Sequence, residues 1–140
     1  AEELRKRGGD KGEYGATTGR PRRVGPIDLV ATRYGCRIQG ATEVALTKLD
    51  VLSYMKEIPV CTQYEVNGEK TDDFPFTAVI DEAKPVLTTV PGWGCDISGV
   101  RKYEDLPQAA RDYVEYVEQA IGVHISYVSV GAGRDEIIYR

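Results

Sequence analysis

The chain has 140 residues, of which 41% are hydrophobic and 29% are charged, an ordinary composition for a soluble globular domain. Its formal net charge is −4, but residues 1–23 contain seven Lys or Arg against four Asp or Glu. The acidic remainder argues against a nucleic-acid-binding protein. No stretch of about 18 apolar residues is present, so we expect no transmembrane helix and no membrane partner.

The N-terminal residues and the cysteines indicate the cellular compartment. Residues 1–7 carry charges with no apolar core behind them, unlike a signal peptide, and they lack an initiator Met. We therefore expect a fragment or a processed form, folded as one unit over residues 1–140. Cys36, Cys61 and Cys95 are far apart and have no zinc-site spacing, which favours a reducing, cytoplasmic compartment.

The first chemical signal is a loop at residues 13–23. It contains three arginines within four residues, two preceding threonines and two interleaved glycines: Arg20, Arg22, Arg23, Thr17, Thr18, Gly15 and Gly19. Arginine forks bind carboxylates and phosphates bidentately, and threonine hydroxyls and loop N–H groups add donors. A solubilising basic turn or a nucleic-acid patch is the plainer interpretation. The interleaved small residues favour a shaped anion pocket.

A helix and a strand are predicted next. Pro26 suits the first helical position, apolar residues then recur at helical spacing, and Gly40 suits the end of the helix. The apolar run at residues 43–46 predicts a short strand, which leads directly into Thr-Lys-Leu-Asp at residues 47–50.

The segment at residues 47–50 has the chemistry to recognise guanine. Guanine presents N1–H and an exocyclic amine as adjacent donors, and the two oxygens of Asp50 can accept both hydrogen bonds. Adenine offers no such pair. The aliphatic stem of Lys48 can lie along the flat base. A bare Lys-x-Asp is more often a solvated turn, so the flanking strand and the rest of the chain must support the assignment.

The second half of the chain predicts a hairpin, a strand, a helix and a final strand. Residues 60–66 alternate, and Asn67-Gly68 is a strong hairpin signal. Residues 71–84 are expected to form an irregular loop, and residues 86–90 a strand. An apolar stripe over residues 106–121 predicts a helix with a capping box at Asp105 and Gln108, ended by Gly122. Residues 123–130 then form a strand.

Three further residues or segments have plain interpretations. Trp93 follows a Pro-Gly turn and is expected to be a packing anchor. His124, the sole histidine, is expected to be a strand residue and not a metal ligand or base. Ser-Val-Gly at residues 129–131 follows the last strand and occurs in many loops. If its strand is a parallel neighbour of the 43–46 strand, both segments lie at the carboxyl edge where ligands bind in open α/β sheets.

Several long motifs resemble one family. They are Gly-Ala-Thr-Thr-Gly-Arg-Pro-Arg-Arg at 15–23, Leu-Thr-Lys-Leu-Asp-Val-Leu at 46–52, Val-Pro-Gly-Trp at 90–93, Tyr-Glu-Asp-Leu-Pro at 103–107 and Ser-Val-Gly at 129–131. Their order resembles the C-terminal part of adenylosuccinate synthetase, over about residues 10–140. The resemblance implies an α/β fold, namely the C-terminal part of a mostly parallel sheet enzyme related to P-loop GTP-binding folds, with a β-hairpin subregion.

The resemblance also implies a reaction. GTP phosphorylates the 6-oxygen of IMP, and the amine of L-aspartate displaces the phosphate to give adenylosuccinate in AMP biosynthesis. The catalytic residues and the Mg²⁺ ligands would lie in the family's N-terminal part, so none is assigned here, and this chain alone is expected to be inactive. The full-length enzyme is expected to be a cytoplasmic homodimer.

The resemblance assigns binding roles to individual residues. The aspartate loop that binds IMP and L-aspartate would comprise Ala16, Thr17, Thr18, Gly19, Arg20, Pro21 and Arg22. The GTP-binding residues would be Arg22, Lys48, Leu49, Asp50, Ser129, Val130 and Gly131. The chain departs from the family at Pro26 and at Gln39, which lie outside the ligand motifs.

Two other classes of protein remain open at this point. A small regulatory GTPase would need Gly-x-x-x-x-Gly-Lys-Ser/Thr to cradle phosphates, and the sequence contains no such stretch. A guanine-nucleotide-binding module or a non-catalytic interaction fragment is the other alternative. It gives no reason for the arginine loop and Lys-x-Asp to occur together.

Overall fold

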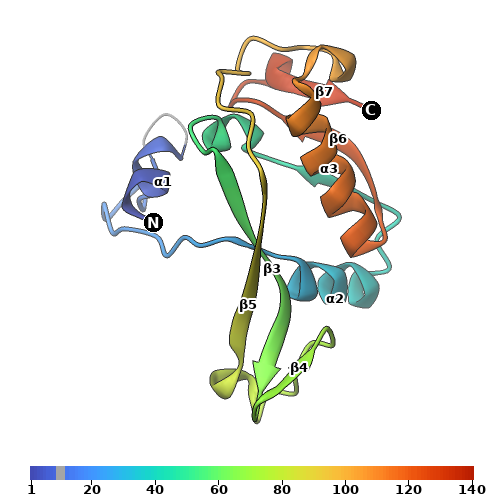
Figure 1. Ribbon diagram of the computed structural model, residues 1–140. Helices are drawn as coiled ribbons and strands as arrows, with labels where there is room; N and C mark the ends of the chain where they lie inside the picture. Colours follow the sequence, from blue (N-terminus) through green and yellow to red (C-terminus); the bar gives the residue numbers. More distant parts are fainter. Residues whose placement is uncertain (9–11) are drawn as a thin grey trace.

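The computed structural model describes residues 1–8 and 12–140, which fold into two small sheets and three α-helices (Figure 1). The first sheet contains β1 (Ile27–Asp28), β3 (Glu57–Val66), β4 (Glu69–Thr71) and β5 (Lys84–Pro91). The second contains β2 (Glu43–Leu46), β6 (His124–Ser129) and β7 (Ile137–Tyr139). Both sheets contain parallel and antiparallel pairs, and the predicted α/β class is confirmed.

The helices are α1 (Glu2–Arg7), α2 (Leu29–Gln39) and α3 (Gln108–Ile121). Four single turns of 3-10 helix complete the structure: η1 (Leu49–Leu52), η2 (Ile80–Glu82), η3 (Tyr103–Asp105) and η4 (Arg134–Glu136). None of the helices in the described ranges is long and apolar enough to cross a bilayer.

The main core lies between α3 and the second sheet. The predicted apolar stripe of α3 is confirmed, because Ala110, Val114 and Val117 are almost completely buried. They pack in one cluster with Ile125 and Val128 of β6. Burying each Val or Ile side chain of this cluster contributes roughly 1.5–3 kcal/mol, which stabilises the position of the sheet whose edge bears the candidate site.

The ribbon formed by β3, β4 and β5 extends away from this core (Figure 1). Asn67 and Gly68 both have positive φ, 53° and 84°, as a two-residue hairpin turn between β3 and β4 requires. The predicted hairpin is therefore confirmed. Most of β5 pairs antiparallel with β3, and it begins at Lys84. The segment expected to be an irregular loop at 71–84 also contains η2.

Three local predictions were wrong. Helix α2 does not begin at Pro26: Ile27 and Asp28 pair with Val60 and Cys61 of β3, and the Asp28 side chain caps the helix by accepting from Ala31 N at 2.9 Å. The expected capping box at α3 is also absent, because the N-cap is Pro107 and Asp105 belongs to η3. The strand predicted at residues 123–130 is β6, one residue shorter at each end, and it is followed by β7.

The expected packing role of Trp93 and the expected strand position of His124 are confirmed. Trp93 packs against Tyr113, with ring centroids 5.9 Å apart, and donates from Nε1 to Ser53 Oγ at 3.1 Å. His124 is the first residue of β6, and its Nδ1 lies 2.8 Å from Glu118 Oε2. Both side chains thus have structural contacts that account for them.

Candidate functional site

The parallel pairing of β2 and β6 brings the two segments predicted to bind guanine to one sheet edge. Leu46, the last residue of β2, is the register partner of Val128 in β6. The turn at residues 47–50 and the turn at residues 129–131 therefore leave neighbouring strands in the same direction. This is the carboxyl edge at which open α/β sheets bind ligands.

The turn after β2 places its three candidate residues, Lys48, Leu49 and Asp50, in different environments. Lys48 has φ 63° and ψ 35°, a left-handed conformation uncommon for a residue with a side chain. The chain then enters η1, where Leu49 is 1% exposed and belongs to the core. Leu49 thus packs in the core, whereas Lys48 is exposed.

Asp50 has a buried oxygen that lacks a partner. Among the described residues, Asp50 Oδ1 is one of two buried side-chain N or O atoms without a hydrogen bond. Burial raises the pKa of the Asp50 carboxyl; the backbone N–H groups of Asp50 and Val51 oppose this, and the charges of Glu136 and Asp96 add to it. An unpaired buried acceptor costs roughly 1–3 kcal/mol, so this oxygen is suited to a ligand donor.

The turn after β6 is held by its own hydrogen bonds. Ser129 Oγ donates to Gly131 O at 2.7 Å, and Val130 N donates to Glu136 O at 2.9 Å. Val130 is fully buried. A Cβ on Gly131 would lie 2.3 Å from the Glu136 carboxyl carbon, so a larger residue there would have to displace the end of the Glu136 side chain. This turn follows β6 at the same sheet edge as the turn that contains Asp50.

The predicted anion loop folds back on itself. Tyr14 and Pro21 form an isolated antiparallel bridge, and Gly15 N donates to Arg20 O at 2.8 Å. Gly19 has φ +66°, which favours glycine. Residues 16–23 are all exposed, so the threonine and arginine side chains of the loop are accessible to a ligand.

Glu13, the first residue of the predicted loop, joins the loop to Lys48. The Glu13 carboxylate accepts a hydrogen bond from Lys48 Nζ through Oε1 and lies 3.1 Å from Arg22 Nη1 through Oε2. The hydrogen bond from Lys48 lowers the pKa of Glu13, against the effect of burial, and the Arg22 contact lowers it further. Its role was not predicted, although one signal was present: Glu13 is the only acidic residue in a loop that is otherwise basic.

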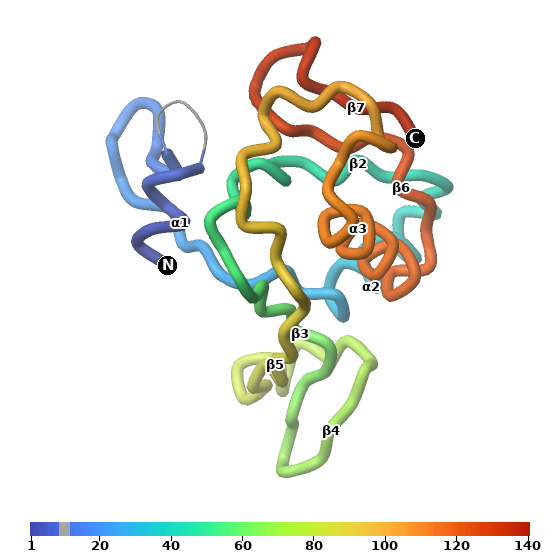
Figure 2. The backbone as a smooth tube through the Cα atoms, turned by 45° about the horizontal axis from the view of Figure 1, so that its top comes forward, coloured from blue at the N-terminus to red at the C-terminus, as the bar shows by residue number. Residues whose placement is uncertain are grey.

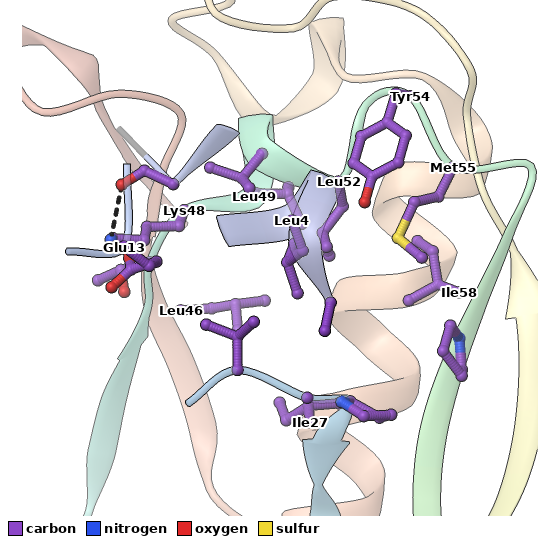
Figure 3. A pocket seen from close by; sticks show the side chains of 18 of the residues that line it. Leu4, Glu13, Ile27, Leu46, Lys48, Leu49, Leu52, Tyr54, Met55 and Ile58 are labelled. Carbon is purple, nitrogen blue, oxygen red and sulfur yellow. Dashed lines mark hydrogen bonds and ion pairs between the residues drawn. The ribbon is translucent and has the colours of Figure 1, made fainter. Parts of the chain in front are cut away.

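A cavity of about 690 Å³ lies between α1, the segment 23–27, η1 and β3. Figure 3 shows Leu4, Leu46, Leu52 and Ile58 around its apolar interior, with Glu13 and Lys48 together on one side. Lys48 and Leu49 line this cavity, but Asp50 and residues 129–131 do not. The cavity is thus adjacent to the candidate base site and does not contain it.

The described residues offer no obvious metal centre. Within residues 1–8 and 12–140, no group of three or more His, Cys, Asp or Glu side chains could hold a metal ion. The resemblance places the Mg²⁺ ligands in the family's N-terminal part, and the described residues supply no such group for the ion. We derive no chemical step through that ion.

Comparisons with known proteins identify the family. The family model described as adenylosuccinate synthetase matches residues 1–138. The adenylosuccinate synthetase of Mycobacterium sp. (strain KMS) is 49% identical over 130 residues, 92% of this chain and 30% of the relative. That of Frankia alni is 47% identical over 138 residues, 98% of this chain and 32% of the relative.

A solved structure agrees with this assignment. The chain superposes on the structure of fully ligated adenylosuccinate synthetase from Plasmodium falciparum with a TM-score of 0.90 and 33% sequence identity. The match covers 99% of this chain and 33% of that one. The chain thus spans about a third of the length of these relatives. It belongs to the adenylosuccinate synthetase family.

Proposed function

We propose that this chain supplies the guanine site and the aspartate loop of an enzyme that ligates IMP and L-aspartate to adenylosuccinate with GTP. The observation that carries the proposal is the partnerless, buried Oδ1 of Asp50 at the shared edge of β2 and β6. Guanine supplies two adjacent donors to such a carboxylate, and adenine does not. Family membership supports the same assignment.

Each segment then has one task. Asp50 accepts from the base, the Lys48 stem and the backbone of residues 129–131 flank it, and the loop at residues 16–22 binds the anionic substrates. Arg22 forks onto a substrate carboxylate and approaches the GTP phosphates, and Arg20 is shared between aspartate and IMP. These contacts bind and orient, which is most of what an enzyme contributes to phosphoryl transfer.

The remaining parts of the activity are proposed to lie elsewhere. We place the general base and the Mg²⁺ ligands outside this chain, in the N-terminal part of the family. When bound, Mg²⁺ neutralises phosphate charge. We also propose that the whole enzyme is a cytoplasmic homodimer, as the resemblance implied. The alternative of a nucleotide-binding module without activity is kept, since about two thirds of the length of the relatives is not represented here.

A chimera tests the proposal. This chain is substituted for its matching segment in the Mycobacterium relative, and adenylosuccinate formation is measured with GTP and with ATP. We expect turnover with GTP and little with ATP. The control is the same chimera with Arg37→Gln, an exposed helix arginine outside the site. A folded chimera that binds GTP and yields no product would favour the binding-module alternative.

A further inference from the structure

The Glu13 side chain lies between the two predicted ligand-binding segments. It is only 15% exposed although both of its cationic partners are on the surface, Lys48 at 49% and Arg22 at 58%. Each carboxylate oxygen takes one partner, Oε1 the Lys48 ammonium and Oε2 the Arg22 guanidinium. One carboxylate therefore holds a residue of the proposed guanine site and a residue of the anion loop simultaneously. Figure 3 shows the first of these two contacts, between Glu13 and Lys48.

The backbone fixes Glu13 before any ligand arrives. Glu13 N donates to Arg5 O at 2.7 Å, and Arg22 N donates to Glu13 O at 2.9 Å. The side chain packs over Gly8 so closely that a Cβ there would lie 2.4 Å from Glu13 Cγ. The helix α1 and the loop stand together at one side of the molecule (Figure 2). The backbone of Glu13 is thus hydrogen-bonded both to α1 and to Arg22 at the other end of the loop, and its side chain packs against Gly8.

The contacts of Glu13 leave the ligand-binding parts of its partners available. In the described part of the chain, Arg22 donates to Glu13 through Nη1. Its Nε and Nη2 donors therefore remain available to bind a ligand carboxylate bidentately. The Lys48 ammonium is engaged by Glu13 and by Gly8 O at 3.2 Å. Its aliphatic stem is then the part presented to a flat base.

We propose that Glu13 is a positioning residue that couples guanine binding beside Lys48 to carboxylate binding at Arg22. The inference rests on the proposed function for the identity of the two ligands. Through Glu13, immobilising Lys48 beneath a base also fixes Arg22, and a carboxylate on Arg22 also fixes Lys48. Such coupling is reciprocal by linkage.

The test is a double-mutant cycle in the active chimera. Glu13→Gln keeps the shape and removes the charge, and we expect the KM for GTP and the KM for aspartate each to rise about three- to tenfold with a smaller change in kcat. Lys48→Gln should also raise the KM for aspartate, although Lys48 is proposed to contact the base and not aspartate. In the Glu13→Gln background, Lys48→Gln should leave the KM for aspartate unchanged.

The controls separate positioning from general structural damage. Glu3→Gln removes another α1-side carboxylate, ion-paired to Arg7 at 2.6 Å, and should leave both KM values within twofold of the unmodified chimera. Glu13→Asp keeps the charge on a side chain one methylene shorter and should give an intermediate effect. Additive effects of Glu13→Gln and Lys48→Gln on the KM for aspartate would overturn the coupling while leaving the synthetase function intact.

A second measurement tests the coupling even if the chimera has no activity. The Nε–H resonance of Arg22 is followed by NMR in the 140-residue chain. Lys48→Gln should shift this resonance when Glu13 is present and leave it unmoved in the Glu13→Gln background. The same shift in both backgrounds, or in neither, would contradict the inference, whatever the reaction of the whole enzyme.

Discussion

Leu46 and Val128 are register partners in the parallel strands β2 and β6, so the turns that follow them meet at one edge of the second sheet. This pairing brings Asp50 close to the segment at residues 129–131, although the two are far apart in the sequence. The long β3–β5 ribbon and α3 lie between them along the chain (Figure 1). The proposed base site, made from two short turns, would thus depend on the core that holds this sheet in place.

The close packing of Gly131 against Glu136 predicts that Gly131→Ala impairs the base site. The added Cβ would push the Glu136 carboxylate away from Gly133 N, which donates to it at 2.5 Å. We expect a loss of about 1–3 kcal/mol in GTP binding, or roughly five- to a hundredfold in affinity.

Calorimetry with GTP on the chimera measures this loss. Gly99→Ala is the matched control, because a Cβ at Gly99 meets nothing within 4 Å. Adding Glu136→Ala to Gly131→Ala should restore part of the affinity by making room. If Gly131→Ala bound GTP as tightly as the unmodified chimera, the turn at 129–131 would not be part of the site.

The burial of Asp50 predicts that this residue lowers the stability of the unliganded chain. Because burial raises the pKa of Asp50 in the folded chain, ionised Asp50 destabilises the unliganded fold. The stability deficit is absent below the unfolded pKa and develops as pH rises through the raised folded pKa. Asp50→Asn should therefore stabilise the unliganded chain at pH 7 by roughly 1 kcal/mol or less.

Urea unfolding of the 140-residue chain at pH 7 and at a pH below the ordinary Asp range measures this effect. The advantage of Asp50→Asn should disappear at the lower pH, where wild-type Asp50 is protonated. The exposed Asp105→Asn serves as a control and should change the free energy of unfolding little at either pH. Equal effects of Asp50→Asn at both pH values would show that its charge does not matter.

The Glu118 carboxylate predicts a stability effect of opposite sign. It accepts from Ile125 N at 2.7 Å and from Arg140, and it contacts His124 Nδ1 at 2.8 Å. Burial alone would raise the pKa of Glu118, but the Arg140 and Ile125 hydrogen bonds and the Arg140 charge bring it below the ordinary value. This stability is present above the unfolded pKa and is lost as pH falls through the folded pKa.

Glu118→Gln should therefore destabilise the chain by about 1–2 kcal/mol at pH 7 and by less in acid. Thermal unfolding over a pH series measures the change. Glu104→Gln, an exposed residue of η3, is the matched control and should have little effect. A Glu118→Gln chain as stable as wild type at pH 7 would mean that these contacts contribute nothing to the fold.

The sequence predicted those elements whose cause is local. Asn67-Gly68 specifies its turn through positive φ, and the 3.6-residue period of α3 follows from the apolar side chains that it buries. The start of α2 could not be predicted this way. Ile27 fits a helical stripe, but its pairing with Val60 extends the chain and moves the cap to Asp28. That contact is long-range and leaves no periodic signal.

The candidate site, too, could be predicted from the sequence only in part. Residue chemistry suffices to nominate Asp50 and the arginine loop, because donor and acceptor geometry is a property of the side chain. The burial of Leu49 and the link through Glu13 depend on tertiary packing. Neither follows from spacing. The P-loop relationship and the ligand contacts of individual residues stay predictions.

The GTP/XTP preference of Asp50→Asn tests the central claim most directly. Xanthine has a carbonyl where guanine has its exocyclic amine, so an Asn amide can donate to it. Losing the charge-assisted contact should weaken GTP binding by about 1.5–3 kcal/mol, or roughly ten- to a hundredfold, while XTP becomes a better substrate. We predict that the KM ratio of GTP to XTP in the chimera rises at least tenfold. An unchanged ratio would contradict the assignment of Asp50 as the residue that recognises guanine.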